Sequence, residues 1–200
     1  MNQETSPKDL NDRLNTIESM LAEGRRSTGC WGWNFVLWGV AFYVAMAWSA
    51  WGQSAWAWPV TMIAAGIITG IVASTRAGGG AETTLGRAIG CLWRAAGISM
   101  FLLLFSMGIS GKLTAPQLSI AVVSGMLGMT NAASAFTLRW RVQLGVAVIW
   151  WAAAVAACFA TVNQAVVIFI IATFVGMIAF GAYGMVRDSR AKPHRGAAHA

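Results

Sequence analysis

The fold is decided by the stretch QAVVIFIIATFVGMIAFGAYGMV at residues 164–186, which contains no charged residue. A helix needs about 20 apolar residues to cross a hydrocarbon core about 30 Å thick, and this stretch is long enough. Five more such stretches precede it, at residues 33–51, 56–75, 92–110, 117–137 and 142–161. Because backbone groups inside a bilayer must be satisfied internally, we expect each stretch to form a helix. We therefore predict an all-α, polytopic membrane protein with a six-helix transmembrane bundle.

Composition supports this class. Hydrophobic residues make up 57% of the 200 residues and charged residues only 10%, which is too few to cover a soluble protein. The joints between the stretches are short, so neighbouring spans should run antiparallel and pair into three hairpins. The chain is then divided into an N-terminal segment (1–32), a transmembrane domain (33–186) and a basic tail (187–200).

The basic residues predict an orientation. All Lys and Arg residues except Lys112 lie in the two tails, in the joints 76–91 and 138–141 or, for Arg94, at the start of the third span. These positions share one side of a six-span protein, and such a bias marks the cytoplasmic side. We expect a bacterial cytoplasmic (inner) membrane protein with both termini in the cytoplasm. The net charge of +7 then reflects orientation and contact with the lipid bilayer, not nucleic-acid binding.

The N-terminal segment SPKDLNDRLNTIESMLAEG (6–24) predicts an amphipathic helix over about residues 7–23, with Ser6 as its cap and Gly24 as its end. Leu10, Leu14, Ile17 and Leu21 recur at helical spacing and are called the N-terminal seam below. A helix this short is marginal by itself, so the seam must be buried. The alternatives are the same helix in a homo-oligomer, a cytosolic protein partner, or the chain's own loops. Acidic residues on the other faces argue against the membrane surface.

The six spans contain no Asp, Glu, Lys or His. Proton relays, haem ligation and acid–base catalysis at membrane depth depend on such side chains. The three Cys residues form no CxxC pair, which argues against disulfide chemistry. We therefore predict no enzymatic activity, no cofactor and no metal.

Four polar side chains enter the spans near the predicted cytoplasmic boundary, each on a different helix: Asn34, Arg94, Asn131 and Gln143. They are either interfacial residues, with the Arg94 side chain reaching the headgroups, or the lining of a polar vestibule. A vestibule would bind a neutral or aromatic solute, with Trp150 as a further contact. Small residues predict helix-packing faces at Gly66, Gly70, Gly125, Gly128 and Gly176.

Two functions follow from these patterns. The first is a non-enzymatic membrane scaffold or signalling partner whose N-terminal seam mediates self-association or docks a cytosolic protein. The alternative is a transport subunit that binds a neutral or aromatic solute and is energised by a separate ATPase. In length and number of spans the chain is similar to six-helix bacterial acid-resistance membrane proteins and to vitamin-binding subunits of energy-coupling-factor transporters, but it carries no motif of either family.

Overall fold

The structure is a computed structural model, and it describes residues 11–16, 18–20, 22, 31–54, 56–76, 84–111 and 115–191. Within these ranges the chain is helical, with no strand. Six of its helices are long and apolar enough to cross a membrane. The predicted all-helical class with six such helices is therefore confirmed.

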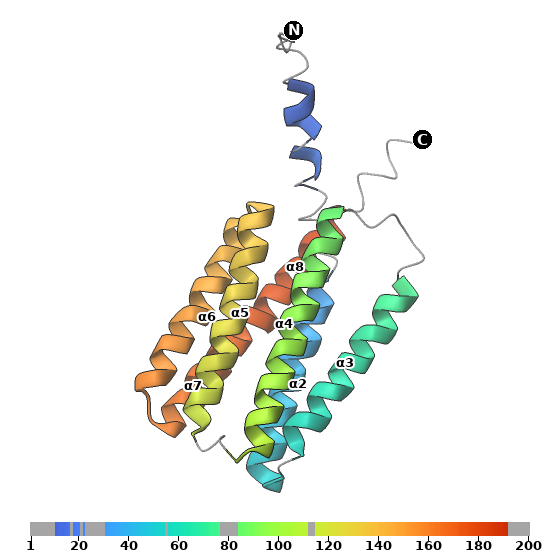
Figure 1. Cartoon of the computed structure of the whole chain (residues 1–200). Helices are drawn as coiled ribbons and strands as arrows, with labels where there is room; N and C mark the ends of the chain where they lie inside the picture. Colours follow the sequence, from blue (N-terminus) through green and yellow to red (C-terminus); the bar gives the residue numbers. More distant parts are fainter. Residues whose placement is uncertain are drawn as a thin grey trace.

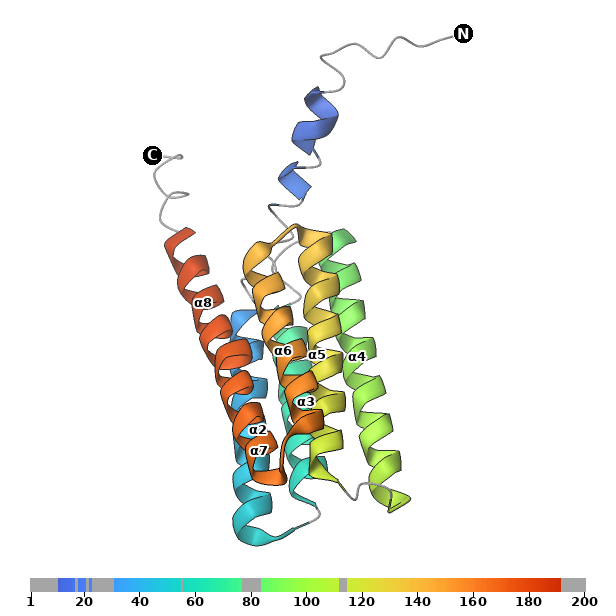
Figure 2. The same cartoon turned by 90° about the vertical axis from the view of Figure 1, so that its left-hand side faces the viewer.

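The first five rods are single helices, and the sixth is continuous but composite (Figure 1). The five are α2 (Gly32–Gly52), α3 (Ala57–Arg76), α4 (Thr84–Ile109), α5 (Pro116–Leu138) and α6 (Arg141–Phe159). The sixth, called the last rod below, consists of α7 (Val162–Thr173), the π-helical turn η2 (Phe174–Ala179) and α8 (Phe180–Ala191). Successive rods run in opposite directions, so α2 begins and α8 ends at the same end of the bundle (Figures 1 and 2).

Helix α4 differs most from its predicted bounds, because it is already helical at Thr84 and not only from residue 92. Half of the joint predicted at 76–91 is thus helix. The length of an apolar run shows how much of a helix can lie in hydrocarbon, but polar residues can continue the same helix beyond it.

Two connections are short for identifiable reasons. After α5, Arg139 adopts a left-handed conformation (φ 49°), and the Trp140 N–H donates to the carbonyl oxygen of Ala135 at 2.9 Å. This C-terminal cap reverses the chain within two residues. At the start of α7, Thr161 and Gln164 form a reciprocal capping box.

Close helix crossings depend on glycine where α2 meets the last rod. A Cβ on Gly32 would lie 2.5 Å from the carbonyl oxygen of Gly181, and a Cβ on Gly181 would lie 2.6 Å from that of Gly32. Farther along α2, a Cβ on Gly39 would press on Met177 and Ile178 of η2. Only residues without a side chain let the two backbones approach this closely.

The core is aromatic and lies between α2, α5, α6 and the last rod. Phe35 packs edge-on against Trp93 and Phe180, with ring centroids 5.2 and 5.1 Å away. Phe169 lies 5.5 Å from Phe42 and 6.0 Å from Trp150. Such edge-on pairs are favourable beyond the area they bury.

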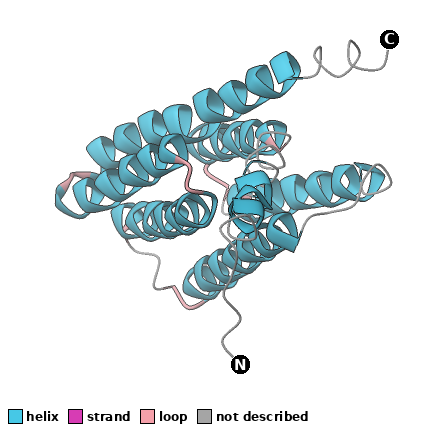
Figure 3. Cartoon of the chain, turned by 90° about the horizontal axis from the view of Figure 1, so that it is seen from above, coloured by secondary structure: helices cyan, strands magenta, loops and turns pink. Residues whose placement is uncertain are grey.

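Helices α3 and α4 contribute few fully buried residues to this core, although partly buried side chains such as Trp58 and Trp93 pack against it. Among the residues described for them, only Ala57, Ala65 and Ile89 are buried. Seen along the bundle, α3 lies at its edge (Figure 3). The most extensive helix contact is between α5 and α6. The outer faces of α3 and α4 are thus not covered by other described residues.

Candidate functional site: a buried polar face on α5, α6 and α7

The N-terminal seam is described at one position. Leu14 lies in the helical residues 11–16 and is 58% exposed. Leu10, Ile17 and Leu21 lie outside the described residues. The described part of this helix lies beyond the end of the bundle where α2 begins (Figure 1).

Two of the four predicted vestibule residues, Arg94 and Asn34, have hydrogen-bond partners in the described chain. Arg94 is exposed on α4, and its guanidinium donates to the carbonyl oxygen of Gly90 at 3.2 Å and to Sγ of Cys91 at 3.5 Å. Asn34 Oδ1 accepts a hydrogen bond from Thr69 Oγ1 at 3.0 Å. This second contact joins α2 to α3.

The other two vestibule residues are deeply buried. Asn131 is 1% exposed; its Nδ2 donates to the carbonyl oxygen of Leu127 at 2.9 Å, while its Oδ1 has no hydrogen-bond partner among the described residues. Gln143 is 0% exposed, and neither atom of its amide has a partner there. The structure thus places the four residues in separate settings, with Asn131 and Gln143 inside the packed α5–α6 pair.

Asn131 and Gln143 belong to a larger group, which we call the buried polar face. It comprises the polar residues that are buried among those described, all at most 1% exposed: Ser124, Thr130, Asn131 and Ser134 on α5, Gln143 on α6 and Thr173 on α7. Part of the face is satisfied, since Thr130 donates to Met126 O at 2.8 Å and Ser134 accepts from Trp93 Nε1 at 3.1 Å. The hydroxyl groups of Ser124 and Thr173 have no such partner in the described part of the chain.

Trp150 of α6 packs against the last rod next to these residues. Its side chain is 0% exposed, and its indole N–H has no acceptor among the described groups. It covers Gly176 so closely that a Cβ there would overlap the indole nitrogen. Trp150 thus contacts Phe169 and Gly176, and Thr173 lies between these two residues along the last rod.

The remaining predicted packing residues divide into two groups. Gly128 lies beneath Trp151 of α6, as Gly176 lies beneath Trp150. Added Cβ atoms at Gly66, Gly70 and Gly125 would meet nothing within 4 Å in the described chain. These three positions are open toward the outside of the chain.

Several residues of the site carried no strong sequence signal. Ser and Thr inside a membrane helix usually donate a hydrogen bond to a carbonyl oxygen of their own helix, as Thr130 does. Ser124 and Thr173 therefore did not predict a polar site. The π-helical turn η2 has no sequence signature either, although such turns are frequent at functional sites. Gly32 and Gly39 mark a close crossing that only the structure reveals.

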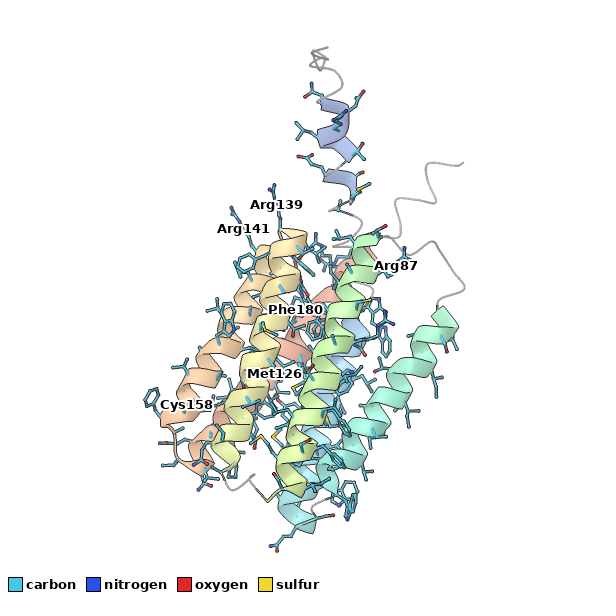
Figure 4. The ribbon with its side chains drawn as sticks, in the orientation of Figure 1. Arg87, Met126, Arg139, Arg141, Cys158 and Phe180 are labelled. Carbon is cyan, nitrogen blue, oxygen red and sulfur yellow. The ribbon has the colours of Figure 1, made fainter. Side chains whose placement is uncertain are left out.

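Positive charge gathers at one end of the bundle, which we call the basic end. Figure 4 shows Arg87, Arg139 and Arg141 at this end, and α8 brings Arg187 to it. The Arg187 guanidinium lies 5.6 Å from the ring centroid of Trp140, a cation–π contact. The end is suited to anionic surfaces.

Within the described residues, no group of three or more His, Cys, Asp or Glu could hold a metal ion. The described cysteines, Cys91 and Cys158, are exposed. Comparisons of the chain with protein-family models, with curated proteins and with solved structures found no match.

Proposed function

We propose that the chain is a non-enzymatic scaffold or signalling partner in a bacterial cytoplasmic membrane, with both termini in the cytoplasm. Its N-terminal helix associates with a second copy or docks a cytosolic protein. The observation that carries this proposal is the exposure of Leu14, a seam residue that is 58% exposed on a described helical stretch. An apolar side chain in the middle of such a seam favours a partner that covers it.

The arrangement of charge and apolar surface supports the same proposal. The basic end carries exposed Arg87, Arg139, Arg141, Arg187 and Arg190, and this bias favours a cytoplasmic location for it. The N-terminal helix would then meet cytosolic proteins. The exposed faces of α3 and α4 would contact lipid or neighbouring subunits in the membrane.

Leu14→Asp in the full chain is expected to weaken self-association or partner recovery by roughly tenfold or more, because a buried Leu contributes about 1.5–3 kcal/mol and a charge would be placed in the contact. Co-purification and the mass of the complex in mild detergent measure this loss. The matched control is Ser19→Asp, which adds the same charge about 140° around the helix from Leu14. Unchanged assembly of Leu14→Asp, or equal loss in both variants, would contradict docking through the seam.

A second candidate function is supported by the buried polar face. Unpartnered amide atoms at Asn131 and Gln143 favour a transport subunit that binds a neutral or aromatic solute and depends on a separate ATPase for energy. Deletion of residues 1–24 separates the two candidates. Loss of the partner or of the oligomer favours the scaffold, whereas retained solute uptake favours transport.

A further inference from the structure

Eight buried polar side-chain atoms have no hydrogen-bond partner in the described chain, and six of them belong to almost fully buried side chains on α5, α6 and α7. The six are Ser124 Oγ, Asn131 Oδ1, Gln143 Nε2 and Oε1, Trp150 Nε1 and Thr173 Oγ1. The five side chains are all at most 1% exposed. Natural proteins pair nearly all buried polar groups, and hydrocarbon around a bundle offers no substitute. So many unpaired atoms on three successive helices favour a polar occupant between them.

The register of α5 and α6 shows how these groups follow one another. The two helices are antiparallel, and Gly128 faces Trp151. At a rise of about 1.5 Å per residue, Trp150 then lies within about 3 Å of the depth of Asn131. Gln143 lies about 7 Å nearer the basic end, and Ser124 lies two turns of α5 (about 10 Å) farther from it. The unpaired groups of α5 and α6 therefore lie at successive depths along the two helices.

The chemistry of these groups defines the ligand class. Asn131 Oδ1 can only accept a hydrogen bond, Trp150 Nε1 can only donate one, and the Gln143 amide can do both. Among the side chains that the structure describes, none that is buried carries a charge. An ion would be desolvated there without a counter-charge, whereas a neutral molecule would not meet this cost.

We propose that these unpaired groups bind small uncharged molecules that both donate and accept hydrogen bonds, either water or a neutral solute such as a simple amide. On α5 and α6 the groups follow one another from Gln143, toward the basic end, through Asn131 and Trp150 to Ser124, and Thr173 lies on the last rod. This inference goes beyond the scaffold function. If the occupant is a solute, the inference rests on the transport candidate, and it then names the class of solute that the transport subunit would bind.

Two substitutions in the purified full-length protein test the occupant. Gln143→Met and Thr173→Val keep the approximate shape of each side chain and remove its hydrogen-bonding atoms. With a polar occupant, each variant should lower the Tm in mild detergent by roughly 2–10 °C, because the occupant loses a partner. Thr130→Val is the control, since the Thr130 hydroxyl already bonds within its own helix. Its effect should be smaller.

The opposite result is equally clear. If the atoms are truly unpaired, removing them relieves a burial penalty, so Gln143→Met and Thr173→Val would raise the Tm, and the proposal would be wrong. A Thr173→Val effect equal to that of Thr130→Val would also overturn it. Because Val is isosteric with Thr, this variant reports on the site even if Gln143→Met does not fold.

Acetamide distinguishes the two sources of the ligand. A Tm increase with added acetamide that is larger in the wild type than in Thr173→Val identifies a neutral solute. Equal responses in both proteins identify water as the occupant. Neither outcome depends on uptake, so failure of the transport candidate in cells would be seen separately.

Discussion

Replacement of Trp150 by alanine is expected to destabilise the bundle by about 3–5 kcal/mol, the usual cost of removing a fully buried aromatic side chain. Trp150 is 0% exposed, lies 6.0 Å from Phe169 and covers Gly176. It thus fills the space between α6 and the last rod at two points, and alanine would leave a cavity there. Reversible unfolding in mixed detergent micelles measures the change in the free energy of unfolding.

The control for this prediction is another tryptophan in a different setting. Trp51 at the end of α2 is 88% exposed. Trp51→Ala should change the free energy of unfolding in micelles by at most about 0.5 kcal/mol, as surface substitutions usually do. Similar losses for the two variants would show that Trp150 does not hold α6 against the last rod.

Gly181→Ala is expected to cost about 1–3 kcal/mol of stability, because the added methyl group overpacks a tight crossing. Its Cβ would lie 2.6 Å from the backbone oxygen of Gly32 and 2.8 Å from Val36 Cγ2. A backbone atom cannot turn aside as a flexible side chain can, so α2 and α8 must separate. The same unfolding measurement shows the loss.

Gly66→Ala is the matched control on α3, where an added Cβ meets nothing within 4 Å in the described part of the chain. Alanine is the better helix former by up to about 1 kcal/mol, so this variant should be as stable as the wild type or slightly more stable. If it loses as much as Gly181→Ala while the protein is oligomeric, the open face of α3 is covered by another subunit. An equal loss in a monomer would contradict the packing described for the two glycines.

The positions of the helices could be predicted from the sequence because they depend on the composition of each stretch by itself. An uncharged run such as 164–186 has one stable form in a bilayer, and clusters such as Arg139 and Arg141 mark where a rod ends. The start of α4 was missed because its first turns, from Thr84, carry too little apolar character to be counted as span. The N-terminal seam stays a prediction, apart from the exposure of Leu14.

The rotation of each helix could not be predicted. A rod that is apolar on every side gives no periodic signal for the face that points inward. The sequence therefore predicted Arg94 and Gln143 equally well as lining of a vestibule, although Arg94 is exposed and Gln143 is fully buried. For the same reason, the spacing of Gly66 and Gly70 predicted a contact that is not found among the described residues, whereas Gly32 and Gly181 approach closely without any shared motif.

The central claim is a six-span bundle whose basic end lies in the cytoplasm, and thiol labelling tests it directly. In a variant without Cys30, Cys91 and Cys158, single cysteines are introduced by Ser110→Cys, at the end opposite the basic end, or by Ser189→Cys, near the end of α8. A membrane-impermeant maleimide added to intact bacterial cells should label the cysteine at 110, and should label that at 189 only after lysis. Labelling of position 189 in intact cells, or of position 110 only after lysis, would contradict the account.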